Sequence, residues 1–416
     1  MNNKPRIFHG PENICGIGGK LAQWQRKNYQ AESRFIVFQD NTAFQNSDLN
    51  IHTEKIGKLR SIKEKVSLFL KSIHAYDIFH FYFGKSFLPF NLDLPILKIF
   101  NKKIIMHYLG SDIRINSLQA RNNAYYSYSL IPKNLSQIDF LKKARMYWQQ
   151  LWFDYCIVGK DLLIHARQVI KEEKIIHNIW VGRSVVPSQK LSKKSHEGIN
   201  IVHAPTNRGL KGTKYIEEAV EKLKIKGISV NLHLLENLPH KELMRFIGEE
   251  ADIVIDQLLN GAFGVISIES LSLGVPVICF LSDDILKEFP EIPIVNANID
   301  NLPQVLEELI ENQDFRSALS EKGISFVDQN FNFDIFSNYP KIKEKPIEVF
   351  FINNKDKKLI YSILLTDNES KKINIRICED SFQLQIFCDL TWIPNLLIDS
   401  SDSRELGIGI FNVSIR

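Results

Sequence analysis

The sequence predicts an α/β protein with two Rossmann-like domains and a small all-β module after them. Short apolar runs alternate with longer helical patterns through about the first 330 residues, a pattern typical of parallel sheets flanked by helices. A polar stretch rich in Ser and Lys, residues 183–198, interrupts this alternation and reads as a linker. After Pro340 short β-type runs replace the helical period. We therefore expect domains at residues 1–185 and 199–340 and a β module at residues 341–416.

The first half contains five strand-like runs. They lie at residues 6–9, 34–38, 77–82, 103–108 and 155–158. A helix is expected at residues 20–27 and another at residues 58–73, where apolar side chains recur on one face and lysines surround them. That amphipathic basic helix suits packing on the sheet, and docking to a membrane surface stays open as an alternative.

The second half repeats the alternation and then changes character. Strands are expected at residues 200–204, 229–235, 252–255 and 275–281, and a helix at residues 314–329 closes this half. Further strand-like runs follow at residues 347–352, 359–365, 373–377, 382–387 and 408–415. Turn-like clusters separate several of these runs, so the last part should form an antiparallel module.

Composition narrows the class of protein. Of 416 residues, 44% are hydrophobic, which suffices for buried cores, and no apolar run approaches the ~18 residues of a membrane span. The start of the chain lacks the apolar stretch of a secretory signal. Five scattered cysteines have no metal-ligand spacing and favour a reducing compartment, so the cytoplasm is the expected location and no metal is expected.

Charge is distributed unevenly along the chain. Lys and Arg exceed Asp and Glu by 14 over residues 1–190, whereas the acidic residues are in excess by 10 over residues 191–340. The basic half suits contact with an anionic partner, such as the inner membrane surface or a phosphate-bearing acceptor. No zinc-finger spacing, RNP-like motif or heptad-linked basic helix occurs, so nucleic acid is not an expected partner.

Residues 203–213 form a loop between a predicted strand and a predicted helix. Arg208, Lys211 and two glycines lie in it, at the strand end where open α/β sheets bind ligands. Such a loop suits a diphosphate, although a solvated surface loop would look the same. Asp256, directly after the strand at residues 252–255, is either a ligand contact or a turn former.

A second segment, residues 261–278, adds a helix start. Phe263, Gly264 and Val265 precede the helix, whose first amides and dipole would face a phosphate placed there. Glu269 on the same helix suits the hydroxyls of a ribose, and its simpler role is a carboxylate that stabilises the helix dipole.

Together these two segments resemble the donor half of retaining GT-B glycosyltransferases of the glycosyltransferase 4 type. The resemblance is strong over about residues 199–282 and weak in the first half. It implies that Lys211 contacts the donor diphosphate and that Glu269 contacts the nucleotide ribose. Two departures are visible: Thr206 stands where the family often has its arginine, and Gly261 stands where the family has its first motif glutamate.

The resemblance extends to two features of the first half. Gly16, Gly18 and Gly19 follow the first strand, as does a loop near the donor phosphates in similar enzymes. His107 and Asp112 lie in a strand-end stretch that resembles the family's His-x-x-Gly-x-Asp. By this resemblance His107 faces the transferred sugar and Asp112 bonds the sugar or the acceptor; a buried structural histidine is the plainer alternative.

The predicted function is transfer of a sugar, by a hexosyl- or N-acetylhexosaminyltransferase, from a UDP- or GDP-linked donor. The acceptor would be a glycan, a lipid-linked molecule or a protein, with retention of configuration, no metal and no cofactor beyond the nucleotide-sugar. Two alternatives remain: a non-catalytic GT-B binding or scaffolding subunit, and a nucleotide-sugar 2-epimerase. Peripheral contact with an anionic membrane and self-association through the β module are further expectations.

Overall fold

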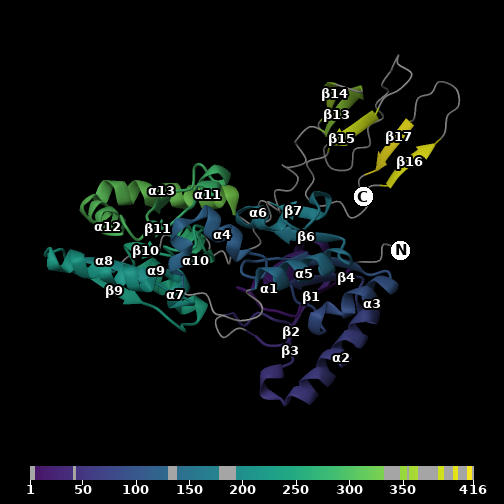
Figure 1. Ribbon diagram of the computed structural model, residues 1–416, viewed down its shortest axis with the longest axis horizontal. Helices are drawn as coiled ribbons and strands as arrows, with labels where there is room; N and C mark the ends of the chain where they lie inside the picture. Colours follow the sequence, from purple (N-terminus) through teal and green to yellow (C-terminus); the bar gives the residue numbers. More distant parts are fainter. Residues whose placement is uncertain are drawn as a thin grey trace. The chain divides into compact units, whose positions relative to one another are not determined.

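The computed structural model describes residues 5–40, 44–129, 138–177 and 194–331, together with the backbone of five strands beyond residue 346. The chain divides into two compact units, Met1–Asn332 and Phe333–Arg416 (Figure 1). The first unit contains two parallel sheets, one in each half. Most of the predicted linker, residues 183–193, lies outside the described residues.

The N-terminal half is built on a parallel sheet with strand order β3-β2-β1-β4-β5-β6-β7 among the described residues. In chain order the strands are β1 (Arg6–Gly10), β2 (Glu32–Val37), β3 (Leu49–Asn50), β4 (Ile78–Tyr82), β5 (Lys103–His107), β6 (Tyr155–Val158) and β7 (Ile175–His177). All five predicted strands are present. The two additional ones, β3 and β7, are edge strands of two and three residues, too short to produce a periodic pattern.

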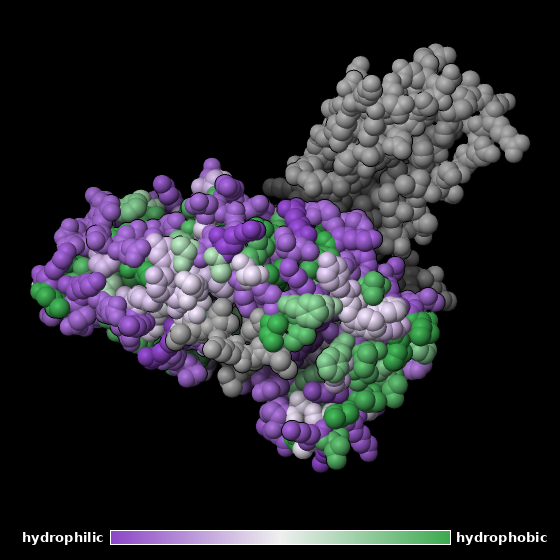
Figure 2. Space-filling model, in the orientation of Figure 1, coloured by the Kyte–Doolittle hydropathy of each residue, from purple (hydrophilic) through white to green (hydrophobic). Residues whose placement is uncertain are grey.

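Helices connect these strands. They are α1 (Ile17–Tyr29), α2 (Lys58–Ala75), α3 (Asp93–Ile99), α4 (Asn116–Asn122), α5 (Asp139–Gln150) and α6 (Leu163–Ala166), with short 3-10 turns η1 (Thr53–Lys55), η2 (Pro89–Asn91), η3 (Ala124–Tyr128), η5 (Lys160–Leu162) and η6 (Glu172–Lys174). The predicted amphipathic helix is α2, but only part of its apolar face is covered. Phe69 and Ile73 are buried, whereas Leu59 is 86% and Ile62 54% exposed. Figure 2 shows hydrophobic surface over the region of α2 and α3.

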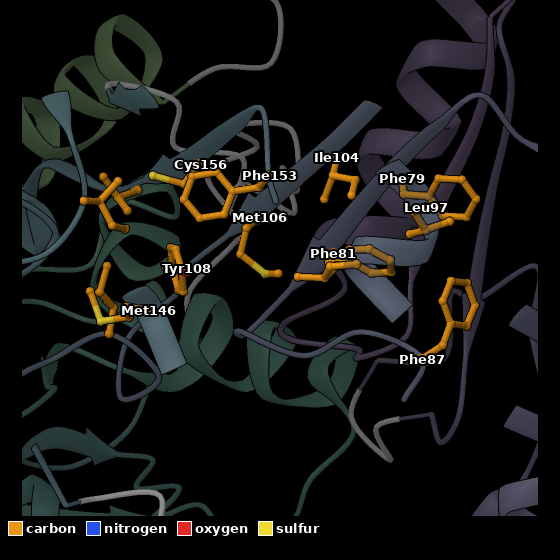
Figure 3. Close-up of a cluster of buried hydrophobic side chains, with 14 of the residues drawn as sticks. Phe79, Phe81, Phe87, Leu97, Ile104, Met106, Tyr108, Met146, Phe153 and Cys156 are labelled. Atoms are coloured by element: carbon orange, nitrogen blue, oxygen red, sulfur yellow. The ribbon is translucent and has the colours of Figure 1, made fainter. Parts of the chain in front are cut away.

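Aromatic and aliphatic side chains from the central strands form the core of this half. Phe79, Phe81 and Met106 point from β4 and β5 toward Phe87 and Leu97, and all five are buried (Figure 3). Burial of large aromatic side chains contributes roughly 1.5–3 kcal/mol each, so this cluster fixes the carboxyl ends of β4 and β5 firmly. The carboxyl end of β5 carries two predicted site residues of this half, His107 and, in the loop that follows, Asp112.

The C-terminal half of the first unit holds a second parallel sheet with strand order β12-β11-β10-β8-β9. Its strands are β8 (Ile199–His203), β9 (Val230–Leu234), β10 (Ile253–Ile255), β11 (Val277–Cys279) and β12 (Ile294–Asn296). Its helices are α7 (Arg208–Lys211), α8 (Thr213–Ile225), α9 (His240–Glu250), α10 (Val265–Ser272), α11 (Asp283–Glu288), α12 (Leu302–Glu311) and α13 (Gln313–Asn330). Separate hydrophobic clusters pack around β10 and its neighbours. The prediction of two Rossmann-like α/β domains is confirmed.

The second unit contains only β-strands among its described residues. A three-stranded antiparallel sheet has the order β14-β13-β15, and β16 pairs with β17. The strands are β13 (Ile347–Asn353), β14 (Asp356–Ile363), β15 (Gln383–Phe387), β16 (Leu397–Ser401) and β17 (Ile410–Ser414). The antiparallel β module is therefore present; the strand predicted at residues 373–377 lies outside the described residues.

Candidate functional site

A cavity of about 470 Å³ lies between the two Rossmann-like domains, lined by residues of both. Five predicted site residues line it: His107, Lys211, Phe263, Gly264 and Val265. The other predicted site residues do not: Gly16, Gly18, Gly19, Asp112, Arg208, Asp256 and Glu269. In the N-terminal domain the lining follows β5 and β6, and in the C-terminal domain it follows β8 and β10. Both sheets thus present their carboxyl ends to the cavity, where ligands bind in open α/β folds.

Lys211 and Asp256 form a buried ion pair at the wall of the C-terminal domain. The Lys211 ammonium bonds to one oxygen of Asp256, whose side chain is fully buried. The second oxygen accepts the Ser267 hydroxyl at 2.7 Å and the Gly264 amide. Burial alone would raise the pKa of Asp256, but Lys211 and these hydrogen bonds bring it below its ordinary value of 3.8. Asp256 therefore orients Lys211 and fixes the start of α10, rather than facing a ligand itself.

The start of α10 faces the cavity through Gly264 and Val265. The first amides of a helix have no carbonyl one turn earlier to bond, and the helix dipole places partial positive charge there. The amide of Gly264 is used by Asp256, which leaves those of Val265 and Ile266 for an incoming group. With the Lys211 ammonium beside them, these groups are suited to a phosphate.

Arg208 lies at the surface in this structure. Its guanidinium donates three hydrogen bonds to Glu236, at 3.0, 3.2 and 2.6 Å, and its side chain is 52% exposed. A donor contact would require it to leave Glu236, so the predicted role of Arg208 stays a prediction.

Glu269 is buried on α10 and bonds to His240 Nε2 at 2.7 Å. The His240 ring lies against Phe44 of the N-terminal domain, with 4.5 Å between ring centroids. Lys20 of α1 also lies near this carboxylate. Burial lowers the pKa of Lys20, whereas the charge of Glu269 raises it. Glu269 is thus enclosed at the domain boundary, and a ribose there would compete with His240.

The glycines after β1 serve close packing. A side chain on Gly18 would meet the Phe35 ring at 2.5 Å, and one on Gly19 would meet Asn46 at the same distance. Gly16 is the N-cap of α1. The residues of this loop that line the cavity are Ile14, Cys15 and Ile17. The glycines hold the loop in place, and whether they contact a donor stays a prediction.

His107 ends β5 and is buried at the cavity wall. Its ring lies 5.4 Å from that of His80, and Nδ1 is buried with no hydrogen-bond partner among the described residues. Burial, reinforced by His9, lowers the pKa of His107 to about 3. The imidazole is therefore neutral near pH 7 and is suited to hydrogen bonding a sugar, not to supplying a charge.

Asp112 shapes the loop that follows His107. Its buried carboxylate accepts the amides of Leu109 at 3.1 Å and Gly110 at 2.7 Å. Burial raises the pKa of Asp112, and the nearby Arg145 opposes this rise. The carboxylate holds Gly110, which lines the cavity. A direct contact of Asp112 with sugar or acceptor stays a prediction.

Side chains of α4 and η3 bind the C-terminal domain. Gln119 and Asn123 donate to the main-chain carbonyls of Asn260 and Leu259, at 2.5 and 2.9 Å. Tyr125 donates to Asp300 at 2.7 Å. We call these contacts the interdomain clasp. The clasp explains why position 261 is a glycine. Its backbone has φ +72°, and a Cβ there would lie 2.9 Å from Asn123 Nδ2. The resemblance to glycosyltransferases places a glutamate at this position. A glycine stands there instead, because a side chain would displace Asn123 from the clasp.

Replacing Gly261 with alanine should destabilise the protein. The left-handed backbone alone costs about 1–2 kcal/mol, and the displaced Asn123 side chain adds a lost hydrogen bond of about 0.5–1.5 kcal/mol. Gly227→Ala is the matched control, because Gly227 has φ +84° but open space around it. Urea unfolding should show a larger loss of unfolding free energy for Gly261→Ala. Equal losses would contradict the clasp at Asn123.

Two residues that line the cavity, Arg114 and Asp161, were not predicted from the sequence. Asp161 lies three residues after β6. Its position after a strand of the parallel sheet is the same signal that identified His107. Within the described ranges, no three His, Cys, Asp or Glu side chains gather as a metal-ion site would require.

Comparisons with known proteins show the fold. No family model matches the sequence, and no curated protein matches it. Among solved structures, sucrose-phosphate synthase from Thermosynechococcus elongatus matches with TM-score 0.56 and 12% identity over 81% of this chain and 97% of that one. WaaG, a glycosyltransferase involved in lipopolysaccharide biosynthesis, matches with TM-score 0.52 and 12% identity over 80% and 98%. A UDP-N-acetylglucosamine 2-epimerase matches more loosely, with TM-score 0.47 and 14% identity over 82% and 96%. The first unit therefore has the GT-B fold, as predicted.

Proposed function

We propose that the chain is a glycosyltransferase that moves a hexose or N-acetylhexosamine from a UDP- or GDP-linked donor to a hydroxyl group of a glycan, a lipid-linked molecule or a protein. The observation that supports this most directly is the shared cavity. Lys211 and the start of α10 line it from one domain, and His107 lines it from the other. A nucleotide-sugar has an anionic diphosphate and a neutral sugar ring, which fit these two kinds of group.

The proposed mechanism relies on positioning and electrostatics. Lys211 and the amides of Val265 and Ile266 stabilise the diphosphate as the bond between the anomeric carbon and phosphate oxygen breaks. The acceptor hydroxyl forms the new bond to that carbon, and its proton passes to the departing phosphate. Retention of configuration follows from attack on the same face that the phosphate leaves. His107, as a neutral imidazole, hydrogen bonds to the sugar.

Incubation with radiolabelled UDP- and GDP-sugars, with and without a panel of acceptors, tests the proposal. Transfer of label to an acceptor supports the glycosyltransferase. Conversion of the free nucleotide-sugar to its 2-epimer would establish the epimerase instead. Binding without either reaction, seen as a thermal shift that grows with ligand concentration, would establish a binding subunit.

Replacing His107 with alanine should reduce transfer on the order of 10²-fold, while UDP or GDP binding changes little. The reason is that its contact is to the sugar, where charge develops in the transition state. His80→Ala is the matched control, since His80 is a buried histidine of the adjacent strand that does not line the cavity. Transfer rates should be compared at equal folded fraction. Equal rates for the two variants would show that His107 is a structural residue.

We also propose peripheral contact with anionic membranes through α2. No described helix is long and apolar enough to cross a bilayer. On α2, exposed Leu59 and Ile62 adjoin Lys58 and Lys63, a pairing of apolar and basic groups that suits a membrane interface.

Flotation with liposomes that contain phosphatidylserine should recover the protein at low salt and less of it at high salt. The double variant Leu59→Glu/Ile62→Glu should lose flotation. Ile225→Glu, at a 79% exposed position of the other domain, is the matched control and should float normally. Absence of the wild-type protein from the floating fraction at low salt would refute the proposal.

A further inference from the structure

The N-terminal wall of the cavity carries a carboxylate that, among the described residues, accepts a hydrogen bond only from its own main-chain amide. Asp161, in η5 directly after β6, lines the cavity with a side chain that is only 9% exposed. No other described residue donates a hydrogen bond to it. The nearest cation is Arg114, whose Nη2 lies 3.9 Å from Asp161 Oδ2, too far for a direct hydrogen bond. Burial raises the pKa of Asp161, and Arg114 opposes this rise.

Asp161 differs from Asp256 in the hydrogen bonds that its carboxylate accepts. Both oxygens of Asp256 are bonded by Lys211, Gly264 and Ser267, so that carboxylate supports its own domain and does not line the cavity. Asp161 is less deeply buried, with a side chain that is 9% exposed, and no other described residue donates a hydrogen bond to it. A largely buried carboxylate with few hydrogen bonds is unfavourable, and a ligand that donates to it relieves this.

The gap of 3.9 Å between Arg114 Nη2 and Asp161 Oδ2 is too narrow for an oxygen to lie between them, but one hydroxyl group beside the pair can reach both atoms. An oxygen about 2.8 Å from each atom would accept from the guanidinium and donate to the carboxylate, with an angle of roughly 90° at the oxygen. Arg114 and Asp161 together have no net charge. A neutral hydroxyl is therefore suited to this position, whereas a phosphate or carboxylate would meet the repulsion of Asp161.

We propose that Arg114 and Asp161 bind a hydroxyl of the acceptor, that the acceptor presents a neutral polyhydroxylated ring there, and that Asp161 discriminates against phosphorylated acceptors. The inference rests on the proposed function. The features that suit the donor diphosphate belong to the C-terminal wall of the cavity, and we assign the N-terminal wall to the acceptor. Asp161 is an acceptor-binding residue in this assignment, and it takes no part in breaking the donor bond.

The test uses the full chain with the nucleotide-sugar that gives the largest thermal shift. Acceptors are methyl glucoside, methyl galactoside and methyl N-acetylglucosaminide, each alongside its 6-phosphate. Binding to the UDP- or GDP-loaded protein is measured by saturation-transfer NMR, and transfer by release of the nucleoside diphosphate. The wild-type protein should bind and use the neutral sugars at least tenfold better than the phosphates.

Asp161→Asn should lower kcat/KM for the neutral acceptors at least tenfold, mainly through a higher KM. It should also reduce the preference of the protein for neutral acceptors over their 6-phosphates. Donor affinity and donor hydrolysis without acceptor should stay within twofold. Asp161→Ser also removes the carboxylate and should give the same changes in kcat/KM and KM. It replaces Asp161→Asn in the test if the asparagine variant folds poorly. Asp314→Asn, at an exposed position in the first turn of α13, is the matched control.

Two results would overturn the assignment. One is a wild-type protein that binds the phosphorylated sugars as well as, or better than, the neutral ones. The other is unchanged acceptor binding and transfer in both Asp161 variants. Failure of the proposed function itself would look different, because no acceptor, neutral or phosphorylated, would then receive sugar from a nucleotide-sugar that the wild-type protein binds.

Discussion

Acidification from pH 7 to pH 5 is expected to remove several kcal/mol of unfolding free energy. Burial lowers the pKa of five histidines from the ordinary 6.5, to about 4 for His9 and His203, to about 3 for His107 and His165, and still further from its ordinary value for His80. Below pH 6.5 the unfolded chain binds protons that the folded chain does not, so stability falls with pH. Each group contributes about 1.4 kcal/mol per pH unit between its two pKa values.

The four groups with a pKa of about 3 or 4 together amount to about 8 kcal/mol between pH 6.5 and 5, on that slope, and His80 acts in the same direction. Asp93, Asp112 and Asp161 act in the opposite direction, because burial raises the pKa of each and protonation relieves their charge. A net loss of several kcal/mol remains, which is comparable with the entire stability of a domain. Four of the five histidines lie in the N-terminal domain, so that domain should unfold first.

Urea unfolding at pH 7.5, 6.0 and 5.0, followed by tryptophan fluorescence, checks this. Trp24, Trp148 and Trp152 lie in the N-terminal domain, and residues 194–331 contain no tryptophan. His80→Phe should flatten the pH dependence, and the exposed-site variant His74→Phe should leave it unchanged. Unfolding midpoints that stay constant down to pH 5 would contradict the neutral buried histidines.

Replacing Lys211 with alanine is expected to affect stability and donor binding together. It leaves the fully buried Asp256 carboxylate without its cation, which costs about 3–5 kcal/mol. It also removes a charged hydrogen bond to the diphosphate, worth about 1.5–3 kcal/mol of binding.

The double variant Lys211→Ala/Asp256→Asn separates the two effects. It should recover most of the stability, because no buried charge is left unpaired, while UDP or GDP binding stays weak. Urea unfolding and calorimetric titration measure the two quantities. Arg208→Ala, which breaks an exposed pair with Glu236, should change stability little. A double variant that binds the nucleotide as tightly as the wild-type protein would remove Lys211 from the donor site.

The sequence predicted the fold well because its strands are apolar and bounded by turns. β5 and β10, for example, stand out as short runs of large aliphatic residues. The edge strands β3, β7 and β12, of two or three residues each, were missed. Their positions are set by neighbouring strands through main-chain hydrogen bonds, which the side-chain pattern does not reveal.

The site was predictable where a residue ends a strand or lies in the segment that follows one. His107 ends β5, Lys211 lies in α7 after β8, and both line the cavity. Sequence spacing does not reveal which carboxylates are already bonded. Asp112 binds the amides of its own loop and Asp256 binds Lys211, whereas Asp161 remains open to the cavity. Only the three-dimensional hydrogen-bond pattern distinguishes these three aspartates.

One residue of the clasp has two separate tasks. The main-chain carbonyl of Asn260 accepts Gln119, while the residue as a whole lines the cavity. Since any amino acid supplies the carbonyl, a substitution at this position that keeps the backbone in place should retain the hydrogen bond from Gln119 while it changes the lining of the cavity.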